Sequence, residues 1–183
     1  MRAACANVGQ AASVFTKGGT ATLDSVDILS CMSGPIPFPE DLLAEIGRIN
    51  VAASQLEFML AEFAAEVLDD VSADYLLSGA GRVLSAARKA ADSLDEHLAS
   101  LFVTWVESAR ELLAERHRIV HSTWFIRPVA PGVGEYFGRH PRTQSELDPN
   151  PDHLRQIASL LDDCTSDGFG LIFAHGRMLK PDR

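Results

Sequence analysis

The stretch that decides the fold is "LASLFVTWVESARELLAERHRIVHSTW", residues 98 to 124. Large apolar side chains recur along it in steps of four and three residues, the spacing of one face of an α-helix. This stripe consists of Leu98, Phe102, Trp105, Ala109, Leu112 and Ile119. Arg116 occupies the position between the last two, so this phase places an arginine in an apolar seam. A second phase, through Leu101 and Ser108, puts more polar residues inside and is less favoured.

The residues that follow predict a change of structure. Between 122 and 144, aromatic and β-branched residues flank a break at Pro131 and Gly132, a pattern typical of a hairpin or an ordered loop. We therefore expect the helix to end near Val120 and a small β-hairpin or ordered loop to follow it.

Three further segments show a helical period. Residues 40 to 68 begin with Glu40 and Asp41 after Pro39, which suits a helix start, and carry a continuous stripe of Leu42, Ile46, Ile49, Ala53, Leu56, Leu60, Phe63 and Val67. A second helix is expected over residues 73 to 92, although Gly79 and Gly81 each disfavour it. The period returns from Pro151 to about His175.

These segments predict an all-α fold. Four principal helices with one β-like insertion before the last helix indicate a four-helix bundle of the up-down type. Residues 1 to 34 are rich in small residues and have no sustained period, so they predict a poorly packed N-terminal extension. Residues 35 to 183 are expected to form a single helical domain.

Composition narrows the setting. The formal net charge is −9, and residues 35 to 125 carry most of it, which argues against broad coating of nucleic acid. Cys5, Cys31 and Cys164 are far apart and include no CxxC pair, so we expect neither a disulfide framework nor a cysteine metal site. No apolar run approaches the length of a membrane span. A cytoplasmic protein without a membrane segment or a cofactor is therefore expected.

One candidate site is a metal centre. His117 and His121 are four residues apart, so on a helix both face one way, as two ligands of one metal ion must. The HExxH pattern of metalloproteases needs a glutamate directly after the first histidine, and Arg118 stands there instead. No second pair of ligands is visible. We therefore assign no metal, and a metal-dependent hydrolase stays a minor alternative.

A second candidate combines Arg116 with His121. Cleavage of RNA by internal attack of a 2′-hydroxyl needs a group that exchanges protons near neutral pH and a cation for the charge that develops on the phosphate. Histidine and arginine supply these two functions. On an ideal helix the two residues lie about 140° apart. Their side chains converge better if the helix ends near Val120.

The sequence from Arg116 to His121 resembles the Arg-x4-6-His motif of the HEPN superfamily, in which a polar residue such as His117 commonly follows the arginine. The resemblance implies a four-helix bundle over about residues 38 to 178, with the motif at the end of one helix. It also implies a metal-independent endoribonuclease with a composite site across a homodimer. Arg116 and His121 match the catalytic pair, and His117 matches the auxiliary position.

The resemblance further implies a toxin or defence effector that acts on RNA, with a cognate antitoxin protein as a partner. One toxin subgroup has a tyrosine two residues after the motif histidine, and Thr123 stands there instead. Regulation through modification of that tyrosine is therefore not expected.

Simpler roles for these residues remain open. Arg116 could pair with an acid, for which Glu57 is the candidate, and Glu57 could equally belong to the site by orienting Arg116. His121 could only cap a helix C-terminus. The corresponding function is a non-catalytic helical dimer that binds a protein or a nucleotide. No role is assigned to His97, His140, His153 and His175.

Overall fold

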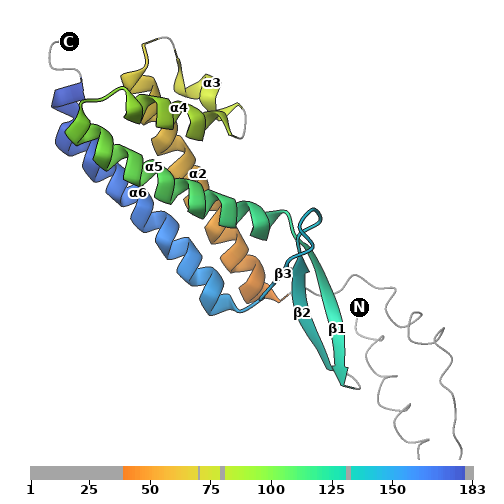
Figure 1. Cartoon of the computed structure of the whole chain (residues 1–183). Helices are drawn as coiled ribbons and strands as arrows, with labels where there is room; N and C mark the ends of the chain where they lie inside the picture. The colour runs from red at the N-terminus through yellow and green to blue at the C-terminus, as the bar shows by residue number, and fades with distance from the viewer. Residues whose placement is uncertain (1–38, 70, 79–80, 131–132, 180–183) are drawn as a thin grey trace, which may run out of the picture. The chain divides into compact units, whose positions relative to one another are not determined.

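A computed structural model describes residues 39–69, 71–78, 81–130 and 133–179. The extension expected over residues 1 to 34 lies outside these residues. The described part is mostly helical, with one small antiparallel sheet, as expected (Figure 1). Its elements, in chain order, are α2 (Glu40–Val67), α3 (Ala73–Leu77), α4 (Arg82–Asp92), α5 (Glu96–Val120), β1 (Thr123–Ala130), β2 (Val133–Arg139), β3 (Glu146–Leu147) and α6 (Pro151–Leu179).

The first long helix matches its expected bounds. α2 begins directly after Pro39, with Glu40 and Asp41 in its first turn, where carboxylates favour the positive end of the helix dipole. Its expected stripe is buried, apart from the partly buried Ile46 and Val67. The core-facing side of α2 was therefore predicted correctly from the spacing.

The single helix expected over residues 73 to 92 is wrong, because the structure has two helices there. α3 ends at Leu77, and α4 begins after Gly81, whose φ is 90°. This left-handed backbone conformation is open to glycine at little cost and cannot continue an α-helix. Gly81 therefore interrupts the expected helix and caps the N-terminus of α4. The sequence had predicted an unfavourable position within a helix for this residue.

The seam of α5 differs from expectation near its C-terminal end. Leu98, Phe102, Trp105 and Ala109 are buried as predicted, but Leu113 is buried next and Leu112 only partly. A straight helix drifts about 20° per heptad from a strict seven-residue repeat, which moves the buried stripe forward by one residue. As a result, Arg116 lies half-buried at the edge of the seam.

The long helices pack through a continuous apolar core. Phe63 of α2 stacks on Phe102 of α5 with ring centroids 4.4 Å apart, and Trp105 meets both rings edge-on. Figure 1 shows α5 lying alongside both α2 and α6.

The helix directions differ from the expected up-down order. Contacts of α2 residues 50 and 63 with α5 residues 116 and 102 show that these two helices run antiparallel. α4 and α6 also run against α5, as the pairs Arg88–Glu107 and Trp105–Cys164 indicate. Helices α2 and α4 therefore share a direction. The reason is that, among the described residues, only the short α3 lies between α2 and α4, where an up-down bundle would not need a return segment.

The expected hairpin is present after α5. β1 pairs with β2 in antiparallel register, with Phe125 opposite Phe137, and β3 extends the sheet beside β2. The break expected at Pro131 and Gly132 lies outside the described residues. Space for a side chain at Gly138 is tight, because a Cβ there would lie 3.2 Å from both the Trp124 ring and Leu147. All three strands of the sheet therefore pack closely at this point.

The last helix begins at Pro151 as expected and extends beyond His175 to Leu179. The indole Nε1 of Trp105 donates a hydrogen bond of 2.8 Å to the backbone oxygen of Cys164 on α6. Gly168, one turn further on, leaves the space that the indole ring fills. No helix in the described part of the chain is both long and apolar enough to cross a membrane.

Candidate functional site

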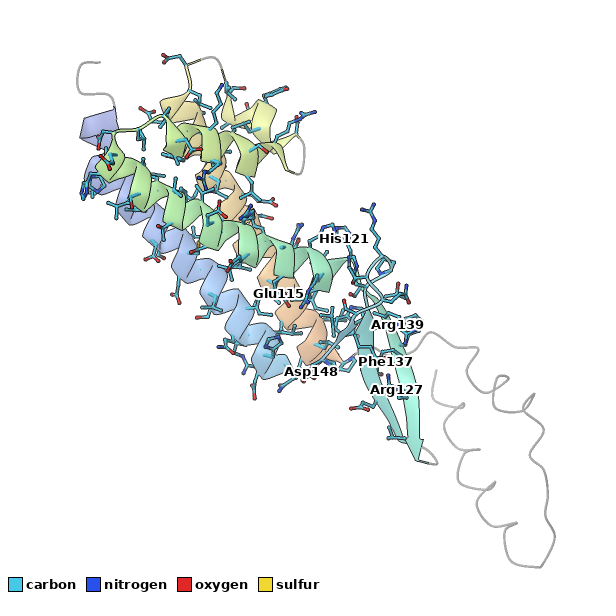
Figure 2. The ribbon with its side chains drawn as sticks, in the orientation of Figure 1. Glu115, His121, Arg127, Phe137, Arg139 and Asp148 are labelled. Atoms are coloured by element: carbon cyan, nitrogen blue, oxygen red, sulfur yellow. The ribbon has the colours of Figure 1, made fainter. Side chains whose placement is uncertain are left out.

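The candidate site is built on the last turn of α5. Val120 is the last helical residue, and His121 caps the helix with its backbone N–H donating to the oxygen of His117 at 3.1 Å. The Ser122 hydroxyl donates to the oxygen of Arg118, after which β1 begins. The expected end of the helix near Val120 is confirmed. Figure 2 shows His121 at this junction, where the helix gives way to the hairpin.

Arg116 reaches across to α2. Its Nη2 donates a hydrogen bond of 2.8 Å to the side-chain oxygen of Asn50. Its Nε is buried and has no partner among the described residues. The pairing with Glu57 that the sequence suggested is not formed, because the guanidinium bonds the neutral amide of Asn50. A half-buried positive charge therefore remains without a carboxylate in the described part of the chain.

Glu57 nevertheless lies near Arg116. Both residues line one cavity of about 450 Å³ between α2, α4 and α5, and His117 lines it as well. His121 does not belong to the lining of this cavity. The structure thus brings three of the four predicted site residues to one cavity and places the fourth beside it.

The two motif histidines contact each other. The rings of His117 and His121 are tilted at 52°, with centroids 4.4 Å apart. This contact follows from their spacing, since residues four apart lie on the same helix face. Arg116 extends toward α2 while the His121 ring lies against His117. His117 is therefore the side chain that connects the two halves of the motif.

A third histidine joins this pair from the loop between β2 and β3. His140 is 5% exposed, and its ring centroid lies 5.8 Å from that of His117. Thr143 fixes the ring, because its backbone N–H donates to Nδ1 at 3.3 Å and its hydroxyl lies 3.2 Å from the same atom. An accepting Nδ1 leaves the ring proton on Nε2. His140 is thus an imidazole held in a fixed orientation, and the sequence predicted no role for it.

Neither period nor spacing could place His140, which is 19 residues beyond His121. One signal was present in the sequence. Residues 116 to 142 contain five arginines and a single glutamate within a chain of net charge −9. Such a local excess of positive charge attracts anions even when the whole chain is acidic.

This charge also affects His117. Partial burial lowers the pKa of its imidazole, and the nearby His121, His140, Arg116 and Arg142 lower it further. The neutral form of His117 is therefore favoured near neutral pH. A neutral imidazole can accept a proton or a hydrogen bond, whereas the cationic form can only donate.

The adjacent hairpin adds two more arginines. Arg127 and Arg139 both donate to one oxygen of Glu146, at 2.9 and 3.3 Å. The guanidinium of Arg127 also lies over the Phe137 ring, 4.5 Å from its centroid. Figure 2 shows Arg127, Phe137 and Arg139 along the hairpin that follows His121. The positive groups of the hairpin are therefore partly neutralised, in contrast to Arg116.

A metal ion bound by His117 and His121 would need further ligands close to them. No group of three or more His, Cys, Asp or Glu side chains suited to a metal ion occurs among the residues that the structure describes. Within the described residues, His117 and His121 therefore have no complete set of metal ligands around them.

Comparison with known proteins adds no assignment. No family model matches the chain, and no similar curated protein or solved structure was found.

Proposed function

We propose that the chain is a metal-independent endoribonuclease of HEPN type, with a composite site at a homodimer interface. In this proposal α2, α4, α5 and α6 are the four helices of the bundle, with the change in direction described above. The observation that carries the proposal is the state of Arg116. Its charge is half-buried, its Nε lacks a partner among the described residues, and it bonds an amide in place of a carboxylate.

This state of Arg116 favours an anionic ligand over a purely structural role. An unsatisfied buried donor on a charged group costs about 1–3 kcal/mol, and an incoming phosphate would remove that cost with charge-assisted hydrogen bonds. A structural arginine in a helix seam would instead be expected to bond a carboxylate, and Glu57 was available on the facing helix.

The proposed chemistry is transfer of the phosphate to the neighbouring 2′-hydroxyl. His121 takes the proton of the attacking 2′-oxygen, and the partner subunit's His121 gives a proton to the 5′-oxygen that leaves. Arg116 stabilises the negative charge that develops on the phosphate oxygens. His117, which is neutral near pH 7, orients the phosphate or the His121 ring through a hydrogen bond. The products are a 2′,3′-cyclic phosphate and a free 5′-hydroxyl.

The dimer is part of the proposal because one protomer supplies only one motif. A two-fold axis near the end of α5 would place two arginines and two histidines in one site. A toxin or defence role in the cytoplasm, with an antitoxin protein as partner, follows from the family resemblance. Static light scattering at micromolar concentration tests the dimer, and a monomer would contradict the composite site.

Cleavage of a mixed-sequence RNA in the presence of EDTA tests the reaction. We expect the wild-type protein to cut and Arg116→Ala and His121→Ala each to lose about 10²–10³-fold in rate. Arg118→Ala is the matched control, because Arg118 lies on the same turn and also has a buried Nε without a partner among the described residues, but pairs with a carboxylate, that of Glu115, at 2.5 Å. Its rate should stay within about threefold of wild type.

Two results would overturn the proposed reaction. One is cleavage that EDTA abolishes. The other is a wild-type protein that is folded and dimeric but cuts no RNA, which would favour the non-catalytic binding module. Thermal unfolding of each variant shows whether a lost activity reflects a lost fold.

A further inference from the structure

The cavity beside Arg116 contains a carboxylate without a partner. Glu57 is half-buried, and no hydrogen bond or ion pair to it is formed within the described part of the chain. The two nearby arginines are engaged elsewhere, Arg110 by Glu107 and Arg116 by Asn50. A carboxylate in partly apolar surroundings is costly to leave without donors. Glu57 therefore accepts no hydrogen bond from the described residues, although it lies in a cavity that also holds arginines.

The rest of the lining has two different characters. Leu77, Leu84 and Leu113 supply apolar walls, whereas Arg110, Arg116 and His117 supply positive or donating groups. The volume of about 450 Å³ falls within the range of about 300–1,000 Å³ typical of small-molecule sites. A fitting ligand combines an apolar ring, donors for Glu57 and an anionic group for the arginines. A nucleotide has all three.

The bases differ in how well they satisfy a carboxylate. Guanine presents two adjacent donors, N1–H and the N2 amino group, which match the two oxygens of Glu57. Adenine, cytosine and uracil each present only one donor group on the corresponding edge. Paired hydrogen bonds to an ionised acceptor are both stronger and more selective than single ones.

We propose that this cavity is a guanine-binding pocket, in which Glu57 reads the base while Arg116 holds the phosphate of the same nucleotide. The inference rests on the proposed function, because Arg116 and His117 belong to both sites. It makes the enzyme selective for guanosine at the cleaved bond. Glu57 is then the specificity-determining residue, a more definite role than the orienting one suggested by the sequence.

Binding of mononucleotides tests the pocket without any cleavage. Calorimetry with His121→Ala and guanosine 3′-monophosphate should give a dissociation constant about tenfold or more below that for uridine 3′-monophosphate. Adding Glu57→Gln should remove this difference, because an amide offers one acceptor and sets its own donors against those of guanine. Glu62→Gln is the matched control, since Glu62 is exposed on the same helix and outside the cavity lining.

Cleavage of oligouridine strands that contain a single guanosine, adenosine or cytidine supplies the second readout. Wild type and Glu62→Gln should cut beside guanosine, and Glu57→Gln should cut without base preference. Equal affinity for the two mononucleotides, or a guanosine preference that survives Glu57→Gln in a folded protein, overturns the pocket. A preference that depends on Glu57 in a protein that cuts no RNA supports the pocket and overturns the proposed reaction alone.

Discussion

Replacing Gly168 by alanine is expected to destabilise the protein, although alanine is the better helix former. A Cβ at this position would lie 2.7 Å from the indole Nε1 of Trp105 and nearer still to two ring carbons. The indole cannot move away freely, because it is 4% exposed and its Nε1 donates to the oxygen of Cys164. Gly170, two residues further along α6, has nothing within 4 Å of its Cβ position. These two glycines form a matched pair.

The magnitudes follow from three terms. Exchange of glycine for alanine in a helix stabilises it by about 1 kcal/mol. Overpacking of the Trp105 ring at Gly168 costs about 1–3 kcal/mol, and loss of the buried indole hydrogen bond costs about 1–3 kcal/mol. We therefore expect Gly168→Ala to lower the free energy of unfolding by about 3 kcal/mol. Gly170→Ala has only the first term and should raise it by about 1 kcal/mol.

Urea unfolding followed by tryptophan fluorescence measures the free energy of unfolding of both variants, and thermal unfolding followed by circular dichroism measures their Tm. In a domain of this size, Tm should fall by roughly 6–12 °C for Gly168→Ala and rise by roughly 2–4 °C for Gly170→Ala. Equal stability of the two variants would refute the close packing of Trp105 on α6.

Two further predictions concern charged and titrating groups. Glu45 is 3% exposed and accepts from Arg155 at 3.1 Å, so Glu45→Gln should lower the free energy of unfolding by about 1–2 kcal/mol; a change below about 0.5 kcal/mol in urea unfolding would contradict this. The fold lowers the pKa of His117, so protonation of this imidazole disfavours the folded state. The contribution of His117 to the free energy of unfolding is therefore complete at pH values above the pKa of the unfolded chain, about 6.5, and is lost as the pH falls through the pKa of the folded protein. In an NMR titration, the midpoint for His117 should lie below about 6.5 and should move upward in His121→Ala. A midpoint for His117 at or above the value of the unfolded chain would contradict the clustering of these rings.

The sequence predicts features that depend on the local spacing of apolar residues. It does not predict features that depend on contacts with residues far away in the sequence. The bounds of α2 and the end of α5 near Val120 follow from apolar spacing and from the β-like residues beyond it. The break at Gly81 was not predicted because the cost of about 1 kcal/mol for a glycine within a helix does not by itself end one, and the sequence does not reveal its φ of 90°.

The candidate site shows the same division. His117 and His121 meet because they are four residues apart on one helix. The partner of Arg116 could not be read from spacing, since both Asn50 and Glu57 lie on α2 and only the packing of α2 against α5 decides which of them the guanidinium meets. His140 enters the cluster only through the fold of the loop after β2, which no periodicity describes.

The pairing of α2 with α6 has a consequence for the order of folding. Glu45 and Arg155 are 110 residues apart in the sequence, yet they bond across this interface. Contacts of such long range form late, because the entropy of closing the loop must be overcome before any of them is made. During synthesis from the N-terminus, the part of α2 that packs on α6 stays uncovered until α6 has been made. The interface between α2 and α6 can therefore close only after α5 and the hairpin have been made.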